Sequence, residues 1–199
     1  EHAAAIHLYI HAVEASANPR RAERYADRLA ALAPNAGHLV HMPAHIYFVI
    51  GRYKDSLATN LKAVKADEAY IAAEKPAGVY PLGYYPHNVH FVMVSAQMGG
   101  DGAQVVAAAN KLGALIPTEA ARAVPLMQPI KAAPYYAHAD FSPPETVLAL
   151  EDPGDIPYVR TAWHYARGVV LARAGNLAQA RSELAAIEKI LAGTDYAPF

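Results

Sequence analysis

Residues 161–187 read TAWHYARGVVLARAGNLAQARSELAAI and contain the clearest helical hairpin of the chain. Gly175 lies between two runs of helix-forming residues, where a glycine can end the first run and turn the chain. In the second run, Ala180, Leu184 and Ile187 recur at steps of three and four residues. This spacing places them on one face of a helix. The segment therefore predicts two short helices that pack against each other across a glycine turn.

Similar hairpins recur along the chain. Gly37 follows Ala3 by about 34 residues, a repeat length found in proteins built from stacked helix pairs. Gly51 and Gly100 mark turns in earlier windows, as Gly175 does in the last. We predict an all-α protein in which about five helix pairs stack as one solenoid domain. The expected units are residues 3–36, 37–70, 86–119, 128–160 and 161–194, with insertions at residues 71–85 and 120–127.

The composition is that of a folded protein and excludes several kinds of site. Of the 199 residues, 54% are hydrophobic and 18% are charged, which argues against disorder. The 17 basic and 18 acidic residues nearly balance, and no stripe of lysine or arginine predicts nucleic acid as a partner. There is no cysteine, which excludes disulfides, thiolate metal sites and cysteine nucleophiles. The apolar runs are too short to predict a membrane span.

The two ends of the chain suggest that it belongs to a larger assembly. The sequence begins at Glu1 rather than methionine, enters helical sequence at once and shows no targeting segment. We therefore expect a processed or excised part of a longer protein, and the compartment stays open. No polar capping helix follows the last helical run, residues 177–191. Its outer face is expected to pair with a missing flanking segment or with a second copy in a homo-oligomer.

Four histidine-containing motifs are spread along the chain: IHLYIHAVEAS at residues 6–16, HLVHMPAHIY at 38–47, YYPHNVHF at 84–91 and WHYARG at 163–168. Together they resemble a group of bacterial tetratricopeptide-repeat (TPR) proteins. The resemblance spans nearly the whole chain and is weakest from about residue 104 to 158. It implies the TPR fold, with the first helix of each repeat lining a concave groove. The group has no agreed biochemical activity, so the resemblance transfers no catalytic residue.

Seven of the ten histidines share a small set of positions in successive repeats. Counted from the start of each window, they lie one residue (His38, His87), four residues (His7, His41, His90) or eight residues (His11, His45) along the first helix. These steps place the histidines of one helix on one face. The resemblance implies that this face lines the groove. For the remaining three, His2, His138 and His164, we expect packing roles.

The aligned histidines predict a site for a divalent transition metal. Neutral imidazole suits Zn, Cu and Ni, and two histidines at positions i and i+4 of a helix can chelate one ion. His7 and His11 have this spacing, and so do His41 and His45. First helices of adjacent repeats lie about 8–10 Å apart, close enough for their side chains to converge. These four residues are therefore the first expected ligands.

The other aligned residues extend this hypothesis. His38, His87 and His90 are expected to form a second site or an extension of the first. Glu14 continues the face of His7 and His11 as a ligand, a hydrogen-bond partner of the ligands or a candidate catalytic base. Pro43 lies inside the expected first helix of the second repeat, which it either kinks or starts afresh.

Two other functions remain open at the level of sequence. One is a peptide- or protein-binding TPR adaptor, whose expected groove-lining residues besides the histidines are Tyr47, Asn88, Tyr136 and Tyr165. The other is a metal-dependent hydrolase that uses metal-bound water. The chain contains no HExxH, GxSxG or P-loop motif to support an enzyme. The tyrosine-rich segment at residues 80–85 is expected to cover the edge of the groove.

Overall fold

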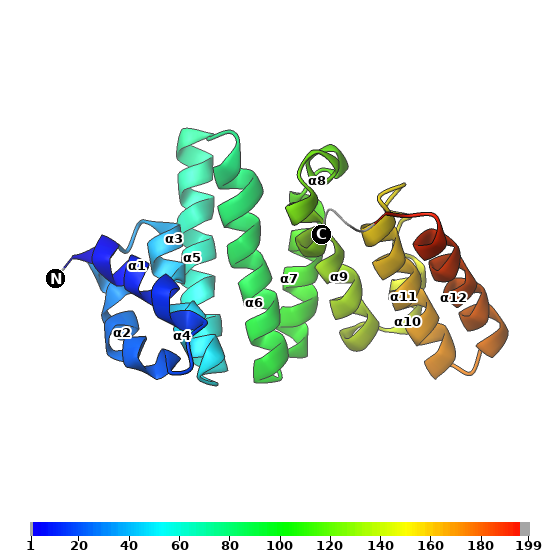
Figure 1. Cartoon of the computed structure of the whole chain (residues 1–199), viewed down its shortest axis with the longest axis horizontal. Helices are drawn as coiled ribbons and strands as arrows, with labels where there is room; N and C mark the ends of the chain where they lie inside the picture. Colours follow the sequence, from blue (N-terminus) through cyan, green and yellow to red (C-terminus); the bar gives the residue numbers. More distant parts are fainter. Residues whose placement is uncertain (1, 196–199) are drawn as a thin grey trace. The chain divides into compact units, whose positions relative to one another are not determined.

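The computed structural model describes residues 2–195 (Figure 1). The regular secondary structure of these residues is all helical, and the described part of the chain contains no β-strand. The prediction of an all-α protein is confirmed. The chain groups into two compact units, with the division between Gln104 and Val105.

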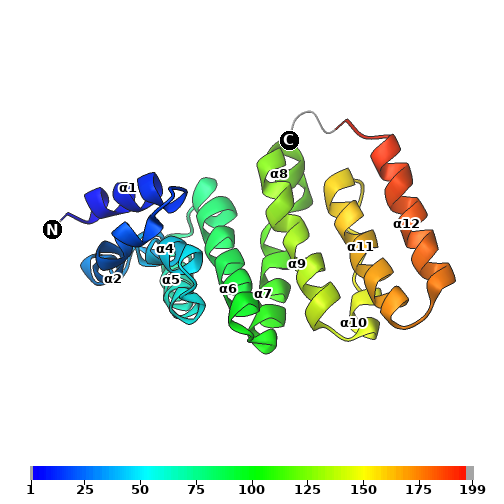
Figure 2. The ribbon, with the colours of Figure 1, turned by 60° about the horizontal axis from the view of Figure 1, so that its bottom comes forward.

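The first unit contains the elements that carry the aligned histidines. They are α1 (Ala3–Glu14), the 3-10 turn η1 (Pro19–Ala22), α2 (Glu23–Leu32), α3 (Gly37–His41), α4 (Pro43–Val49), α5 (Tyr53–Glu74), the π-helical turn η2 (Tyr80–Tyr84) and α6 (Tyr85–Gly99). Helix α5 packs against α3, α4 and α6, and it lies beside α6 in both ribbon views (Figures 1 and 2). The hydroxyls of Ser56 and Ser95 lie 2.8 Å apart and join these two helices in the interior.

The core of the first unit determines which face of α1 carries the histidines. Ile6, Ile10 and Val13 are buried and pack with residues of α2 and α4, including Leu29 and Ile46. Apolar residues at this spacing occupy one stripe of the helix, so the positions between them face elsewhere. Because the stripe of Ile6, Ile10 and Val13 is buried, the neighbouring stripe, which carries the histidines of α1, faces away from α2.

The helix that contains HLVHMPAHIY is interrupted at the proline. Helix α3 ends at His41, and α4 starts afresh at Pro43. Between them Met42 keeps a helical backbone with φ −49° and ψ −38°. Proline is well placed at the first position of a helix, because its missing N–H has no partner to lose there. As a result, His38 and His41 lie on α3 and His45 lies on α4.

The turns follow the predicted glycines. Gly51, Gly100 and Gly175 all have positive φ angles, of 86°, 81° and 78°. A side chain at such a position is strained, so glycine is the residue that closes these hairpins at least cost. The predicted turn positions are confirmed. Helix α5, in contrast, continues to Glu74, beyond residue 70, where the predicted repeat 37–70 was expected to end.

The second unit is a further set of packed helices. It contains most of α7 (Gly102–Leu115), then α8 (Thr118–Ala123), η3 (Pro125–Met127), α9 (Gln128–Phe141), α10 (Pro144–Leu148), α11 (Pro157–Arg173) and α12 (Leu177–Ala192). Helix α11 packs against both α9 and α12. None of the described helices is long and apolar enough to span a bilayer.

Candidate metal centre

The structure gathers six of the seven aligned histidines into two groups of three. The first group, which we call the outer triad, consists of His7 and His11 from α1 and His38 from α3. The second, which we call the inner triad, consists of His41 from α3, His45 from α4 and His87 from α6. Within each triad, one nitrogen from every ring lies within 4.8 Å of the other two. His90 lies outside both triads.

The composition of the triads refines the expectation from sequence. Each expected i, i+4 pair is present, and each gains a third histidine from another helix. The five-residue helix α3 links the two groups, because His38 at its start faces the outer triad and His41 at its end faces the inner one. The ring centroids of these two residues are 6.0 Å apart.

The inner triad has the tighter geometry. The Nε2 atom of His41 lies 2.8 Å from Nε2 of His45 and 3.1 Å from Nε2 of His87. A tetrahedral zinc ion with bonds of about 2.0–2.1 Å would hold two nitrogens about 3.3 Å apart. The Nε2 atom of His41 therefore lies slightly closer to the other two nitrogens than metal-bound ligands lie to each other.

A hydrogen bond to Asn60 sets the tautomer of His41. Asn60 donates from its amide nitrogen to the backbone oxygen of Ser56 at 2.8 Å, which turns its oxygen toward the histidine. His41 Nδ1 lies 2.6 Å from that oxygen and must be the donor. The proton of a neutral His41 is therefore on Nδ1, and its Nε2 presents a lone pair to the inner triad.

The same reasoning applies to His45. Its Nδ1 contacts a carboxylate oxygen of Glu14, which can only accept, so Nδ1 carries the proton. Nε2 of a neutral His45 is then bare as well. Two bare nitrogens 2.8 Å apart repel each other unless a cation lies between them. A cation between the two nitrogens, either an extra proton or a metal ion, would remove this repulsion.

Burial disfavours the extra proton. Desolvation, with a further contribution from the positive charge of neighbouring histidines, lowers the pKa of His87 to about 4 and that of His41 well below its usual value. The pKa of His45 is also lowered by burial, although Glu14 opposes the shift. At neutral pH these imidazoles are uncharged, which is the form that binds metals.

The outer triad is more open. Nε2 of His7 and Nε2 of His38 are 3.2 Å apart, and the side chain of His11 is 40% exposed. The exposed ring of Tyr84 lies against His38, with centroids 4.7 Å apart. Burial, followed by the charges of neighbouring histidines, lowers the pKa of His38 to about 4. The tyrosine-rich segment thus covers one member of the outer triad.

Glu14 connects the two triads. One carboxylate oxygen lies 2.8 Å from Nδ1 of His11, and the other contacts Nδ1 of His45. Both oxygens are therefore occupied by imidazole N–H groups. A carboxylate in this position fixes the orientation of a ligating histidine and increases its basicity. The geometry favours Glu14 as a hydrogen-bond partner of the ligands over a ligand or a catalytic base.

A buried polar network supports the start of α3. The carboxylate of Asp67 accepts hydrogen bonds from the hydroxyl of Tyr80 and the amide of Asn88, each at 2.7 Å. Gly37 lies directly against it, since a Cβ atom there would be only 1.8 Å from Asp67 Oδ1. The missing side chain at Gly37 therefore lets α3 approach α5 closely enough for His38 and His41 to reach their partners.

Three residues of α5 that support the site were not singled out from the sequence. Ser56, Asn60 and Asp67 are buried on one side of α5, at steps of four and seven residues. Such a polar stripe on the core side of a helix was a detectable signal. Buried polar groups need partners, and on a histidine-rich chain the histidines are available ones.

The other predicted residues lie elsewhere. Tyr47 is 7% exposed and donates a hydrogen bond to Asp27, and Asn88 is completely buried, so neither lines a groove. Tyr136 and Tyr165 are exposed in the second unit, with ring centroids 5.4 Å apart. His90 on α6 is partly buried, and burial lowers its pKa.

The three histidines outside the pattern occupy separate places. His138 is buried and hydrogen-bonded to the hydroxyl of Ser142 at 2.8 Å. His164 contacts Glu183 at 2.6 Å and so links α11 to α12. These two contacts are structural, whereas His2 is exposed near the start of α1.

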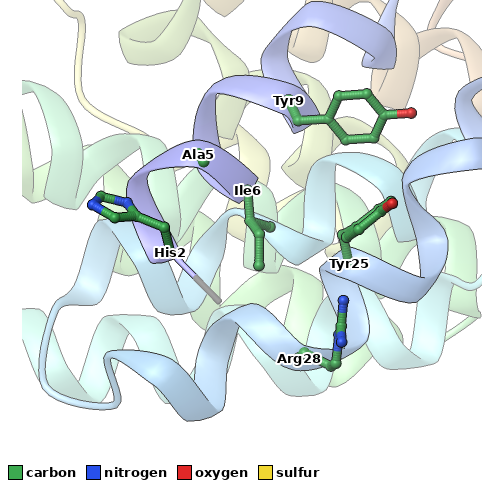
Figure 3. Close-up of a pocket in the computed structure, with 6 residues that line it drawn as sticks. All are labelled: His2, Ala5, Ile6, Tyr9, Tyr25 and Arg28. Atoms are coloured by element: carbon green, nitrogen blue, oxygen red, sulfur yellow. The ribbon is translucent and has the colours of Figure 1, made fainter.

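A separate cavity of about 390 Å³ lies between α1 and α2 (Figure 3). Its lining residues are His2, Ala5, Ile6, Tyr9, Tyr25 and Arg28. On α1 these positions lie on the side of the helix opposite His7 and His11, because each residue turns the helix by about 100°. The cavity is therefore not part of the metal centre.

Comparison of the chain with models of known protein families, with curated proteins and with solved structures found no match.

Proposed function

We propose that this protein binds divalent transition-metal ions, one in each histidine triad. The observation that carries the proposal is the inner triad, where His41 and His45 direct two bare nitrogens at each other from 2.8 Å. A metal ion between them removes the repulsion and uses both lone pairs. Nitrogen-rich sites of this kind suit Zn, Cu and Ni.

The scaffold of the proposed site is of the TPR type. Support comes from consecutive helix pairs closed by glycine turns, and from histidines that recur on the first helix of successive pairs. In such repeats each pair buries part of its apolar surface against the next pair. The fold would then serve to bring matching positions of neighbouring helices together.

A hydrolase is the second candidate function. Each triad supplies three protein ligands, the number found in catalytic zinc sites that keep a fourth position for water. Glu14 is unsuited to act as the base, since both of its oxygens are engaged. The adaptor function has less support, because Tyr47 and Asn88 are buried.

Titration of the metal-free protein with Co²⁺ tests the proposal. We expect visible absorption bands of nitrogen-ligated Co²⁺ that saturate at about two equivalents per chain. His41→Ala should remove the ion of the inner triad and leave one equivalent. His7→Ala should remove the ion of the outer triad and also leave one.

The matched control is His2→Ala, which changes an exposed histidine near the same helix. It should titrate as the parent protein does. The proposal would be contradicted if the parent protein bound no Co²⁺. It would also be contradicted if His41→Ala and His7→Ala bound as much Co²⁺ as His2→Ala does.

Metal binding is expected to persist at lower pH than binding by free imidazole. Imidazole binds a metal only when neutral, and the pKa values of His38 and His87 are lowered from 6.5 to about 4. Affinity at the inner triad, where burial also lowers the pKa of His41 well below its usual value, should therefore change little from pH 7.5 to about 5.5 and fall steeply between about 5 and 4. Competition with a chromophoric chelator at each pH measures this. A loss centred near pH 6.5 would show that the histidines are not desolvated.

A further inference from the structure

The two triads lie side by side in the first unit. The ring centroids of His11 and His45 are 5.4 Å apart, and those of His38 and His41 are 6.0 Å apart. Three protein nitrogens leave at least one coordination position of each ion open. Ions bound in neighbouring triads can share one ligand that has several donor atoms.

The charge of such a centre identifies the kind of ligand. Imidazole binds a metal ion in its neutral form, so the six ring donors bring no negative charge, and the carboxylate that the structure places against both triads is that of Glu14. Two divalent ions would bring four positive charges to the site. The carboxylate of Glu14 would compensate only one of them. A large uncompensated charge in a partly buried site attracts anions strongly.

We infer that the paired ions bind a phosphate dianion, either free or as the terminal group of a phosphate monoester, with its oxygens bridging the two triads. The inference rests on the proposed function. A phosphate monoester carries nearly two negative charges at neutral pH and has three acceptor oxygens. It can therefore contact both ions and compensate more charge than a carboxylate does.

The outer triad is the more exposed of the two. His11 is 40% exposed, whereas His41 is completely buried. A phosphate group that enters past His7 and His11 meets the outer ion first, and its ester group then points toward solvent. The site is therefore expected to accept the organic part of a monoester.

Calorimetric titration of the protein loaded with two equivalents of Zn²⁺ tests this inference. The probes are inorganic phosphate, phenyl phosphate and acetate. Both phosphates should bind with affinities within about threefold of each other, and acetate at least about tenfold more weakly. The zinc-loaded His7→Ala variant, which keeps the inner triad, should bind phosphate at least about tenfold more weakly than the parent. The metal-free protein should not bind it.

The outcomes separate this inference from the proposed function. Two bound zinc ions without phosphate binding would overturn the inference and leave metal binding in place. Equal affinity in the parent and in His7→Ala would overturn the bridging geometry. If inorganic phosphate bound and phenyl phosphate did not, the site would not accept a phosphate monoester, and that part of the inference would be overturned. A chain that binds no zinc would overturn both proposals.

Discussion

Replacing Gly37 with alanine is expected to destabilise the first unit by about 3 kcal/mol and to abolish metal binding at both triads. The new Cβ atom would lie 1.8 Å from Oδ1 of Asp67 and 3.2 Å from the backbone oxygen of Ala63. Asp67 cannot move aside without cost, because Tyr80 and Asn88 hold its two oxygens. Helix α3 must therefore shift away from α5, and it carries a histidine of each triad.

The control for this substitution is Gly99→Ala, at the end of α6. A Cβ atom at Gly99 meets nothing within 4 Å, so this change adds a methyl group without a clash. Urea unfolding and Co²⁺ binding are measured on both variants. Equal stability and equal metal binding in Gly37→Ala and Gly99→Ala would show that the close approach of α3 to α5 is not needed for the site.

Removal of metal is expected to lower the melting temperature of the parent protein by about 10 °C or more. An ion that binds only the folded state stabilises it by about 4 kcal/mol when its free concentration is a thousandfold above the dissociation constant. Without the ion, the facing nitrogens of His41 and His45 repel each other, which adds to the loss. Thermal unfolding with saturating Zn²⁺ and with excess chelator measures the difference.

The double variant His7→Ala/His41→Ala shows whether the triads cause this effect. Each substitution removes one nitrogen of one triad, so the melting temperature should respond little to zinc or to chelator. A variant that keeps the full response of the parent would place the stabilising ion elsewhere in the molecule.

The clustering of the histidines was largely predictable from sequence. Histidines that recur at steps of three and four residues must share a helical face, whatever the packing of the helices. This reasoning selected the six residues that the structure brings together, and it also selected His90, which belongs to neither triad. Periodicity specifies a face but not which neighbouring helix the face meets.

The division into triads was not predictable because it depends on a short helix. Helix α3 has five residues and ends before Pro43, so the directions of His38 and His41 depend on how α3 packs against α5. That packing depends in turn on Gly37 and Asp67, which are 30 residues apart in sequence and become neighbours only in the folded chain.

The expected groove residues illustrate a limit of motif reasoning. Tyr47 follows His45 by two residues, and residues at this separation do not share a helical face. Asn88 follows His87 directly and is likewise turned toward the interior, where it bonds Asp67. Both belong to the same motifs as the histidines, but their role in the structure is to hold the helices that carry the site.

The most direct test of the account is the zinc content of the purified, tag-free protein after incubation with Zn²⁺ and removal of free ions. Elemental analysis should find about two zinc ions per chain in the parent and in His2→Ala. It should find about one in His7→Ala and in His41→Ala, and none in the double variant. Absence of bound zinc in the parent, repeated with copper and nickel, would contradict the assignment of the triads as metal sites.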